Sequence, residues 1–249
     1  MNVFDYEINS WNDWSRIFRN VETFICIINK IASNHSIEFS KIKLLPAGTN
    51  ANFLLDDKII KIYPPTESGI CGNSGESIES EIFYLKRCEK LNLNVSRLID
   101  YGKIDDKYCF NYLILSFVAG KPFSEFKQKI TDSDKINFVN AIKRFLKEFN
   151  GEYIKDFNAE FIIKRVINNH RWKNFSETLQ KNIFDYVSNM LLNNAVHVHG
   201  DLTEDNVRQF NQNFKLLTIN LKFHFKLTYS IILFTIWSET AVLSVKPSK

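Results

Sequence analysis

The chain has 249 residues, 45% of them hydrophobic and 24% charged, so it can bury one or two hydrophobic cores and is not intrinsically disordered. Its formal net charge of +4 comes from scattered basic residues, which excludes the basic stripe of a nucleic-acid-binding protein. The four cysteines have no CxxC or other metal-ligand spacing, and the N-terminus has no signal-peptide pattern. The sequence therefore predicts a reduced, cytoplasmic protein.

The first predicted elements are a helix and then a group of strands. Apolar residues recur at helical spacing between Trp14 and Ala32, which predicts one amphipathic helix. The period then shortens in three apolar runs that are divided by turn residues, and this predicts three antiparallel strands. The runs are Ile42 to Leu45, Asn52 to Leu55 and Lys58 to Tyr63.

The turn from Pro46 to Asn50 joins the first two of these strands. Gly48 permits a close approach of the backbone to a ligand, and free amides with the side chains of Thr49 and Asn50 can donate to phosphate oxygens. The alternative is a hairpin turn with no ligand.

Lys61 and Glu81 are the first charged residues that the pattern places toward the inside. Strand alternation puts Lys61 on one face with Ile59 and Tyr63. Glu81 lies on the apolar stripe of a helix predicted from Ser77 to Asn92, where a carboxylate needs a partner. The alternative is a solvated Lys61 with Glu81 at the edge of the stripe, and Glu79 is then the other candidate carboxylate.

A buried strand from Tyr112 to Val118 ends just before Gly120, and the chain beyond it is mainly helical. Three helices are predicted before residue 195. They are Thr131 to Asn150, with a polar cap at Thr131 or Asp132, then residues 161–172 and 177–192.

The segment HVHGDLTEDNV, His197 to Val207, has the residues that phosphoryl transfer needs. Asp201 can position an attacking hydroxyl and accept its proton, and the amide oxygen of Asn206 can hold Mg²⁺. Gly200 allows a sharp turn beside the carboxylate, and we expect His199 to orient the loop. The alternative is a polar loop without catalytic function.

This segment resembles the catalytic loop of the aminoglycoside phosphotransferase and choline kinase-like family, within the protein-kinase-like superfamily. The resemblance covers roughly Lys43 to Asn220. It implies an α+β, two-lobed protein-kinase-like fold with an antiparallel-sheet N-terminal lobe and a mainly helical, incomplete C-terminal lobe. These would be a nucleotide-binding lobe at 1–118, a helical lobe with the catalytic loop at 119–220 and an atypical tail at 221–249.

The resemblance also implies a function and roles for particular residues. Members carry the γ-phosphate of a nucleoside triphosphate, ATP or GTP with Mg²⁺, to a hydroxyl group of a small molecule. The implied catalytic residue is Asp201, and the implied metal ligands are Asn206 and the residue at position 220. The implied nucleotide-binding residues are Lys61, held by Glu81, then Gly48, Thr49 and Asn50 over the phosphates, and the backbone of Ser116, Phe117 and Val118 along the adenine edge.

The chain departs from the family pattern at Asn220, where a second metal-binding Asp is expected at the end of the hairpin that follows Asn206. An amide oxygen can ligate Mg²⁺ but carries no negative charge. A reading-frame slip at this position would explain the abrupt change, because one added T can restore a family-like continuation. The alternative function is a catalytically impaired nucleotide-binding pseudoenzyme or a nonfunctional truncated product. A membrane span at Leu227 to Val245 is disfavoured because Glu239, Ser and Thr interrupt it.

Overall fold

The computed structural model describes most of the N-terminal half of the chain and separate segments of the remainder. Two compact units share the chain, and the predicted lobe boundaries at 118 and 220 stay predictions. The first unit holds Met1–Phe145 with Thr203–Leu221, and the second holds Leu146–Leu202 with Lys222–Lys249. The described residues are 2–45, 49–68, 78–149, 160, 163–164, 167–168, 170–189, 195–198, 207–210, 213–216 and 222–225.

A five-stranded antiparallel sheet forms the centre of the first unit, with strand order β1-β2-β3-β5-β4. The three strands predicted between residues 42 and 63 are confirmed as β1 to β3, and the predicted strand near 112–118 is confirmed as β5. β4 completes the sheet as the outer neighbour of β5. The strands are β1 Ile42–Leu44, β2 Ala51–Leu55, β3 Lys58–Ile62, β4 Leu98–Asp105 and β5 Cys109–Ser116.

The prediction of one continuous N-terminal helix is wrong, because two capped helices occupy this segment. They are α1 (Trp11–Ile17) and α2 (Val21–Asn34). Asn20 has an extended backbone conformation, and its side chain accepts a hydrogen bond of 2.8 Å from the N–H of Glu22. Asn20 is therefore the N-cap of a second helix, α2. Ser10 caps α1 in the same manner. Apolar spacing continues across the break and conceals it.

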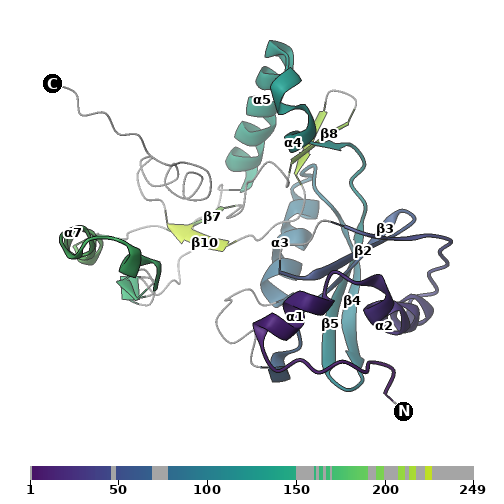
Figure 1. Cartoon of the computed structure of the whole chain (residues 1–249). Helices are drawn as coiled ribbons and strands as arrows, with labels where there is room; N and C mark the ends of the chain where they lie inside the picture. The colour runs from purple at the N-terminus through teal and green to yellow at the C-terminus, as the bar shows by residue number, and fades with distance from the viewer. Residues whose placement is uncertain are drawn as a thin grey trace. The chain divides into compact units, whose positions relative to one another are not determined.

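Different helices cover the two faces of the sheet (Figure 1), and each face belongs to its own core. On the outer face the N-terminal helices pack against alternate residues of β2, β3 and β5, including Phe53, Ile60 and Ile114. On the inner face Leu85 of α3 (Ile78–Lys90) packs against Ile59 and other residues of the opposite parity. Each fully buried Ile, Leu or Phe contributes on the order of 1.5–3 kcal/mol to folding. The sheet is therefore packed against helices on both faces.

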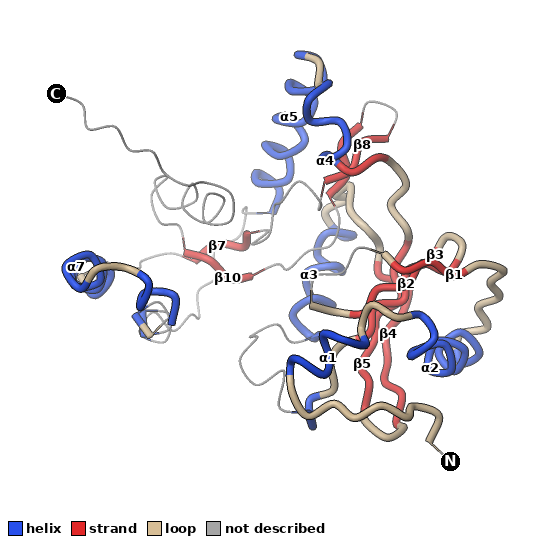
Figure 2. Tube along the Cα trace, viewed as in Figure 1, coloured by secondary structure: helices blue, strands red, loops and turns tan. Residues whose placement is uncertain are grey.

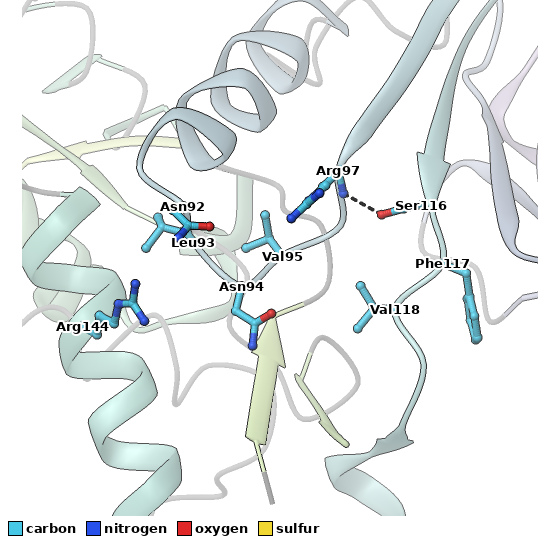
Figure 3. Close-up of a pocket in the computed structure, with 9 residues that line it drawn as sticks. All are labelled: Asn92, Leu93, Asn94, Val95, Arg97, Ser116, Phe117, Val118 and Arg144. Atoms are coloured by element: carbon cyan, nitrogen blue, oxygen red, sulfur yellow. Dashed lines mark hydrogen bonds between the residues drawn. The ribbon is translucent and has the colours of Figure 1, made fainter. Parts of the chain in front are cut away.

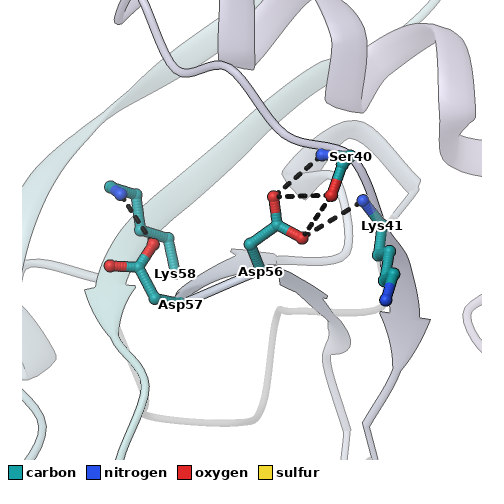
Figure 4. A network of polar contacts seen from close by, with 5 residues as sticks. All are labelled: Ser40, Lys41, Asp56, Asp57 and Lys58. Carbon is teal, nitrogen blue, oxygen red and sulfur yellow. Dashed lines mark hydrogen bonds and ion pairs between the residues drawn. The ribbon is translucent and has the colours of Figure 1, made fainter.

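The turn between β2 and β3 is tied to the residues that lead into β1 (Figure 4). Asp56 has a positive φ of 49°, which Asp tolerates better than most residues. Its carboxylate accepts hydrogen bonds from the backbone N–H groups of Ser40, at 2.8 Å, and Lys41, at 3.2 Å. The exposed ion pair between Lys58 and Asp57 adds little, since both charges stay near water.

Asp106, in the turn between β4 and β5, fastens the N-terminal segment to the sheet. Its carboxylate accepts hydrogen bonds from the backbone N–H groups of Val3 and Phe4, both 3.0 Å from Oδ1, and from Lys30 Nζ at 2.9 Å. Burial acts to raise the pKa of Asp106, but these bonds and one from the N–H of Lys107 outweigh it. They hold the pKa well below its usual value.

Beyond β5 the first unit continues through short elements into α5. A second, three-stranded sheet has the order β6-β8-β9. The sequence predicts a hairpin with strands at Val207 to Phe210 and Phe214 to Ile219 and a turn at Asn211 to Asn213. Its two strands are confirmed as β8 and β9, and residues 217–219 lie outside the described residues. The predicted cap of α5 is confirmed at Thr131, whose hydroxyl accepts from the N–H of Asp134 at 3.1 Å. The elements are β6 Lys121–Pro122, α4 Phe123–Phe126, α5 Asp132–Phe149, β8 Val207–Phe210 and β9 Asn213–Leu216.

In the second unit the described elements are a short 3-10 helix at His170–Asn174, α7 at Glu177–Ser188, and the strands β7 at Ala195–Val198 and β10 at Lys222–Phe225. β7 and β10 pair in antiparallel register (Figure 2). Most of the helix predicted at 161–172 lies outside the described residues, as does the stretch from Leu227 to Val245. Within the described part of the chain, no helix has the length and apolar character of a membrane span.

Candidate functional site

The centre of the candidate site is a buried ion pair between β3 and α3. The Nζ atom of Lys61 lies 2.8 Å from Oε1 and 2.6 Å from Oε2 of Glu81, so one ammonium group spans both carboxylate oxygens. Each residue is only 7% exposed. The alternative of a solvated Lys61 is therefore wrong. Glu79, the other candidate for the partner carboxylate, is exposed.

Tyr63 completes this cluster from the same face of the sheet. Its hydroxyl donates a short hydrogen bond to Oε2 of Glu81, and its ring centre lies 5.1 Å from Nζ of Lys61. A buried ion pair recovers its loss of hydration only when the remaining lone pairs are also satisfied. The Tyr63 hydroxyl supplies one of these contacts, so the geometry of Lys61 is fixed by two groups.

The neighbouring strand β2 brings polar side chains to the same region. Asn52 is the direct cross-strand partner of Lys61, so the two side chains share one face. Thr49 and Asn50 stand just before β2, and Asn50 is 8% exposed. The predicted phosphate turn is thus next to Lys61 in the register of the sheet, although Gly48 lies outside the described residues.

The segment after β5, residues 116–120, is the predicted adenine-binding link. The backbone N–H groups of Ser116 and Phe117 are already used, since they donate to the carbonyls of Arg97, at 2.9 Å, and Asp57, at 3.0 Å. The Ser116 hydroxyl accepts from the N–H of Arg97 at 2.8 Å. Within the described part of the chain the N–H of Val118 has no hydrogen-bond acceptor. Of the three amides it is therefore the one without an acceptor in this part of the chain.

Arg208 of β8 fastens this link. Its Nη1 donates a 2.8 Å hydrogen bond to the carbonyl of Gly120, whose positive φ of 129° suits glycine. Its guanidinium also lies 5.5 Å from the centre of the Phe117 ring. Burial lowers the pKa of Arg208, while the charge of Glu125 acts in the opposite direction. The link and the strand that follows the catalytic-loop motif are thereby held together.

A pocket of about 510 Å³ is lined in part by the link residues Ser116, Phe117 and Val118 (Figure 3). Arg97 and Arg144 bring positive charge to it, and Val118 contributes apolar surface. Arg97 directly precedes β4, and β5 separates β4 from β3 in the sheet. The pocket therefore contains the predicted adenine-binding link but none of the residues predicted to hold phosphate.

The remaining predicted residues, Asp201, Asn206 and Asn220, lie outside the described residues. The flanking strand β8 begins at Val207, directly after Asn206. Among the described residues no cluster of His, Cys, Asp and Glu has the arrangement of a metal site. The roles of these three residues stay predictions from the sequence.

Sequence reasoning missed how three residues support the site. Strand alternation placed Tyr63 on the correct face but gave no sign of its bond to Glu81. The sequence pattern gave no role to Arg208, and its place directly after the segment His197 to Val207 was the available signal. Trp14 was counted as an end of an apolar helix, whereas its indole N–H donates to the carbonyl of Thr49 at 2.8 Å.

Comparison with known proteins identifies the fold. No protein-family model and no curated protein matches this sequence. The solved GDP complex of wild-type aminoglycoside 2'-phosphotransferase-IIIa is similar with a TM-score of 0.59 and 13% identity, over 80% of this chain and 74% of the other.

Two further aminoglycoside phosphotransferase structures agree with this. The GDP and kanamycin complex of APH(2'')-IIIa has a TM-score of 0.56 and 14% identity, over 79% of this chain and 72% of the other. APH(3'')-Id from Streptomyces rimosus has a TM-score of 0.54 and 13% identity, over 80% and 78%. The antiparallel sheet with its helices thus has the protein-kinase-like fold of the aminoglycoside phosphotransferases.

Proposed function

We propose that this protein transfers the γ-phosphate of ATP or GTP to a hydroxyl group of a small molecule. The observation that carries the proposal is the buried pair of Lys61 and Glu81, with Tyr63 on the same carboxylate. A cation held at the inner face of the sheet, beside the turn that ends in Thr49 and Asn50, suits the phosphates of a nucleotide. The predicted cytoplasmic location, where nucleoside triphosphates are available, is part of this proposal.

Each of the chain's own groups has a part in this reaction. Lys61 binds the α and β phosphates, and Glu81 with Tyr63 keeps its ammonium group in place. The Val118 N–H donates to the base. Asp201 positions the acceptor hydroxyl and takes its proton as the acceptor oxygen bonds to the γ-phosphorus, while the bond from that phosphorus to the β–γ bridging oxygen breaks. The nucleoside diphosphate leaves with the electron pair of that bond.

Mg²⁺ fits the donor chemistry of the predicted loop and hairpin, because the side-chain oxygens of Asn206 and Asn220 are hard ligands. The ion would neutralise the charge of the phosphates. Two amides supply no negative charge, so the phosphates themselves have to provide most of the charge that retains the ion. This is the weakest part of the predicted machinery.

Similar solved structures suggest which nucleotide bases and acceptors to test. Similar solved structures include GDP complexes, a complex with kanamycin, and a ternary complex with streptomycin and ATP, each of those proteins being an aminoglycoside phosphotransferase. At 13–14% identity these ligands guide the choice of probes for this chain. Aminoglycosides, choline, sugars and amino alcohols are the acceptors to test with both nucleotides.

The test combines binding with turnover. We expect ATP or GTP with Mg²⁺ to raise the melting temperature of the protein, and nucleoside diphosphate to form when an acceptor is added. A folded protein whose melting temperature responds to neither nucleotide would refute nucleotide binding and with it the proposed function.

One alternative has an observation of its own. Asn220 occupies the position where the resemblance predicts a metal-binding Asp, which favours a catalytically impaired nucleotide-binding protein or a nonfunctional truncated product. Binding of nucleotide without turnover of any acceptor would favour this alternative. Sequencing of the gene decides the frame-slip hypothesis, because no open continuation in the second frame would end it.

A further inference from the structure

Trp14 connects the N-terminal helices to the beginning of β2. Its side chain is fully buried in the outer core, stacked on Phe18 and edge-on to Phe24. Its indole N–H donates a hydrogen bond of 2.8 Å to the carbonyl of Thr49. Thr49 and Asn50 are bent residues outside the strand ladder, so this bond and not sheet pairing sets the direction of their shared peptide group.

The direction of that peptide group has a chemical consequence. In a planar trans peptide the carbonyl oxygen and the amide hydrogen point in opposite directions. The carbonyl of Thr49 faces Trp14, which belongs to the outer core with Phe53 and Ile60. The N–H of Asn50 is therefore directed away from the outer core.

The N–H of Asn50 is the candidate donor to a ligand. Within the described residues it donates to no backbone or side-chain acceptor. Two positions further along the chain, Asn52 is paired across the strands with Lys61 on the inner face. A backbone amide with no acceptor among the described residues, two positions before the strand partner of a fixed ammonium group, is an arrangement that can bind phosphate oxygens.

We propose that Trp14 is a positioning residue for phosphate: by holding the Thr49 carbonyl, it aims the N–H of Asn50 at the polyphosphate of a nucleotide. The inference rests on the proposed function and adds a part for the N-terminal helices, which otherwise only cover the sheet. The base, which binds at the link near Val118, is outside its influence. Loss of the indole donor therefore weakens phosphate binding selectively.

The sharpest variant replaces Trp14 by benzothienylalanine, which keeps the shape of the indole but has sulfur in place of its N–H. Trp14→Phe is the simpler version and removes packing as well. Trp11→Phe is the matched control, because Trp11 lies on the same helix, is 47% exposed and makes no side-chain hydrogen bond within the described part of the chain. The probes are ATP with Mg²⁺ and adenosine, with GTP and guanosine as the second pair.

The expected result is a loss of roughly tenfold in affinity for the triphosphate, with the affinity for the nucleoside unchanged. The Trp11→Phe protein should bind both as the unchanged protein does. Equal losses for triphosphate and nucleoside, or no loss for either, would overturn the inference.

A second measurement separates this inference from the proposed function. Hydrogen exchange of the backbone amides from Asn50 to Phe53 should become faster in the Trp14 variants without any nucleotide, and remain as before in Trp11→Phe. Unchanged exchange refutes the role of Trp14 even if nucleotide binds. Faster exchange in a protein that binds no nucleotide would support the role of the hydrogen bond from Trp14 to Thr49, and would refute only the proposed function.

Discussion

Lys61 and Glu81 are 20 residues apart in the sequence, and in the structure a single ammonium group contacts both oxygens of a single carboxylate. The two side chains come from a strand and a helix that enclose the inner core. Because both are nearly inaccessible to water, neither can lose the other without leaving a buried charge. The pair is thus both a support of the fold and the core of the proposed nucleotide site.

Replacement of Lys61 by Met should affect stability and function together. Glu81 keeps its bond from Tyr63 but loses its counter-charge, so we expect the free energy of unfolding to fall by about 3 kcal/mol or more. Nucleotide affinity and any turnover should fall at least ~100-fold, since the phosphate-binding cation is gone. Urea unfolding and nucleotide titration measure the two effects. Lys58→Met on the same strand is the control, and an equal loss there would refute a special role for Lys61.

Tyr63→Phe should destabilise the protein by roughly 1–2 kcal/mol, because the carboxylate of Glu81 loses a buried hydrogen-bond donor. In a double-mutant cycle with Glu81→Ala the two losses should not add, since each substitution removes the hydrogen bond between the two side chains. Urea unfolding of the four proteins gives the coupling energy. Additive losses would show that Tyr63 acts through packing alone.

Asp201→Asn should abolish turnover while nucleotide still binds. The amide retains the size of the side chain but cannot accept the proton of the acceptor, and general bases contribute on the order of 10²–10⁴-fold to rates. Steady-state assays and nucleotide titration are compared for this variant. A variant that keeps full turnover would remove Asp201 from the mechanism.

Asn220→Asp should increase the affinity for Mg²⁺ by about tenfold in the presence of nucleotide, because a carboxylate adds the negative charge that the amide lacks. Titration of Mg²⁺ against nucleotide binding measures the change. Asn211→Asp, in the predicted hairpin turn, adds the same charge away from the predicted metal and should change little. Equal effects of both substitutions would mean that position 220 is not a metal ligand.

Stability should depend on pH through Asp106. Its folded-state pKa lies below the unfolded value of about 3.9, so its contribution is fully present above that pH and is lost as the pH falls through the folded-state pKa. Asp106→Asn should lower the free energy of unfolding at pH 7 and flatten its decline in acid. Urea unfolding between neutral pH and pH 3 tests this against Asp5→Asn, an exposed carboxylate. Parallel pH profiles for the unchanged and Asp106→Asn proteins would contradict the prediction.

The sequence predicted those parts of the fold and site that depend on local periodicity. Alternation in β3 and the helical stripe of α3 placed Lys61 and Glu81 on inward faces, where a carboxylate requires a partner, and the family resemblance supplied the pairing between them. The break between α1 and α2 was missed since apolar spacing runs through it. The only sequence sign of the break is Asn20, a single polar residue that caps α2.

Contacts between distant segments could not be predicted in this way. The bond from Trp14 to Thr49 joins residues 35 apart, and that from Arg208 to Gly120 joins residues 88 apart. Nothing in the periodicity of either segment specifies the other. The order in which β4 and β5 complete the sheet likewise depends on packing, which single-strand patterns do not encode.

The partnership of β6 with β8 has a consequence for how the protein is made. β6 is synthesised with the first part of the chain, yet its partner strand emerges from the ribosome roughly 4–18 s later at 5–20 residues per second. Until then the link after β5 lacks the contacts of Arg208, and the backbone groups of β6 are unpaired. We expect the first unit to complete its five-stranded sheet during translation, and to fasten its link only when synthesis has passed Leu216.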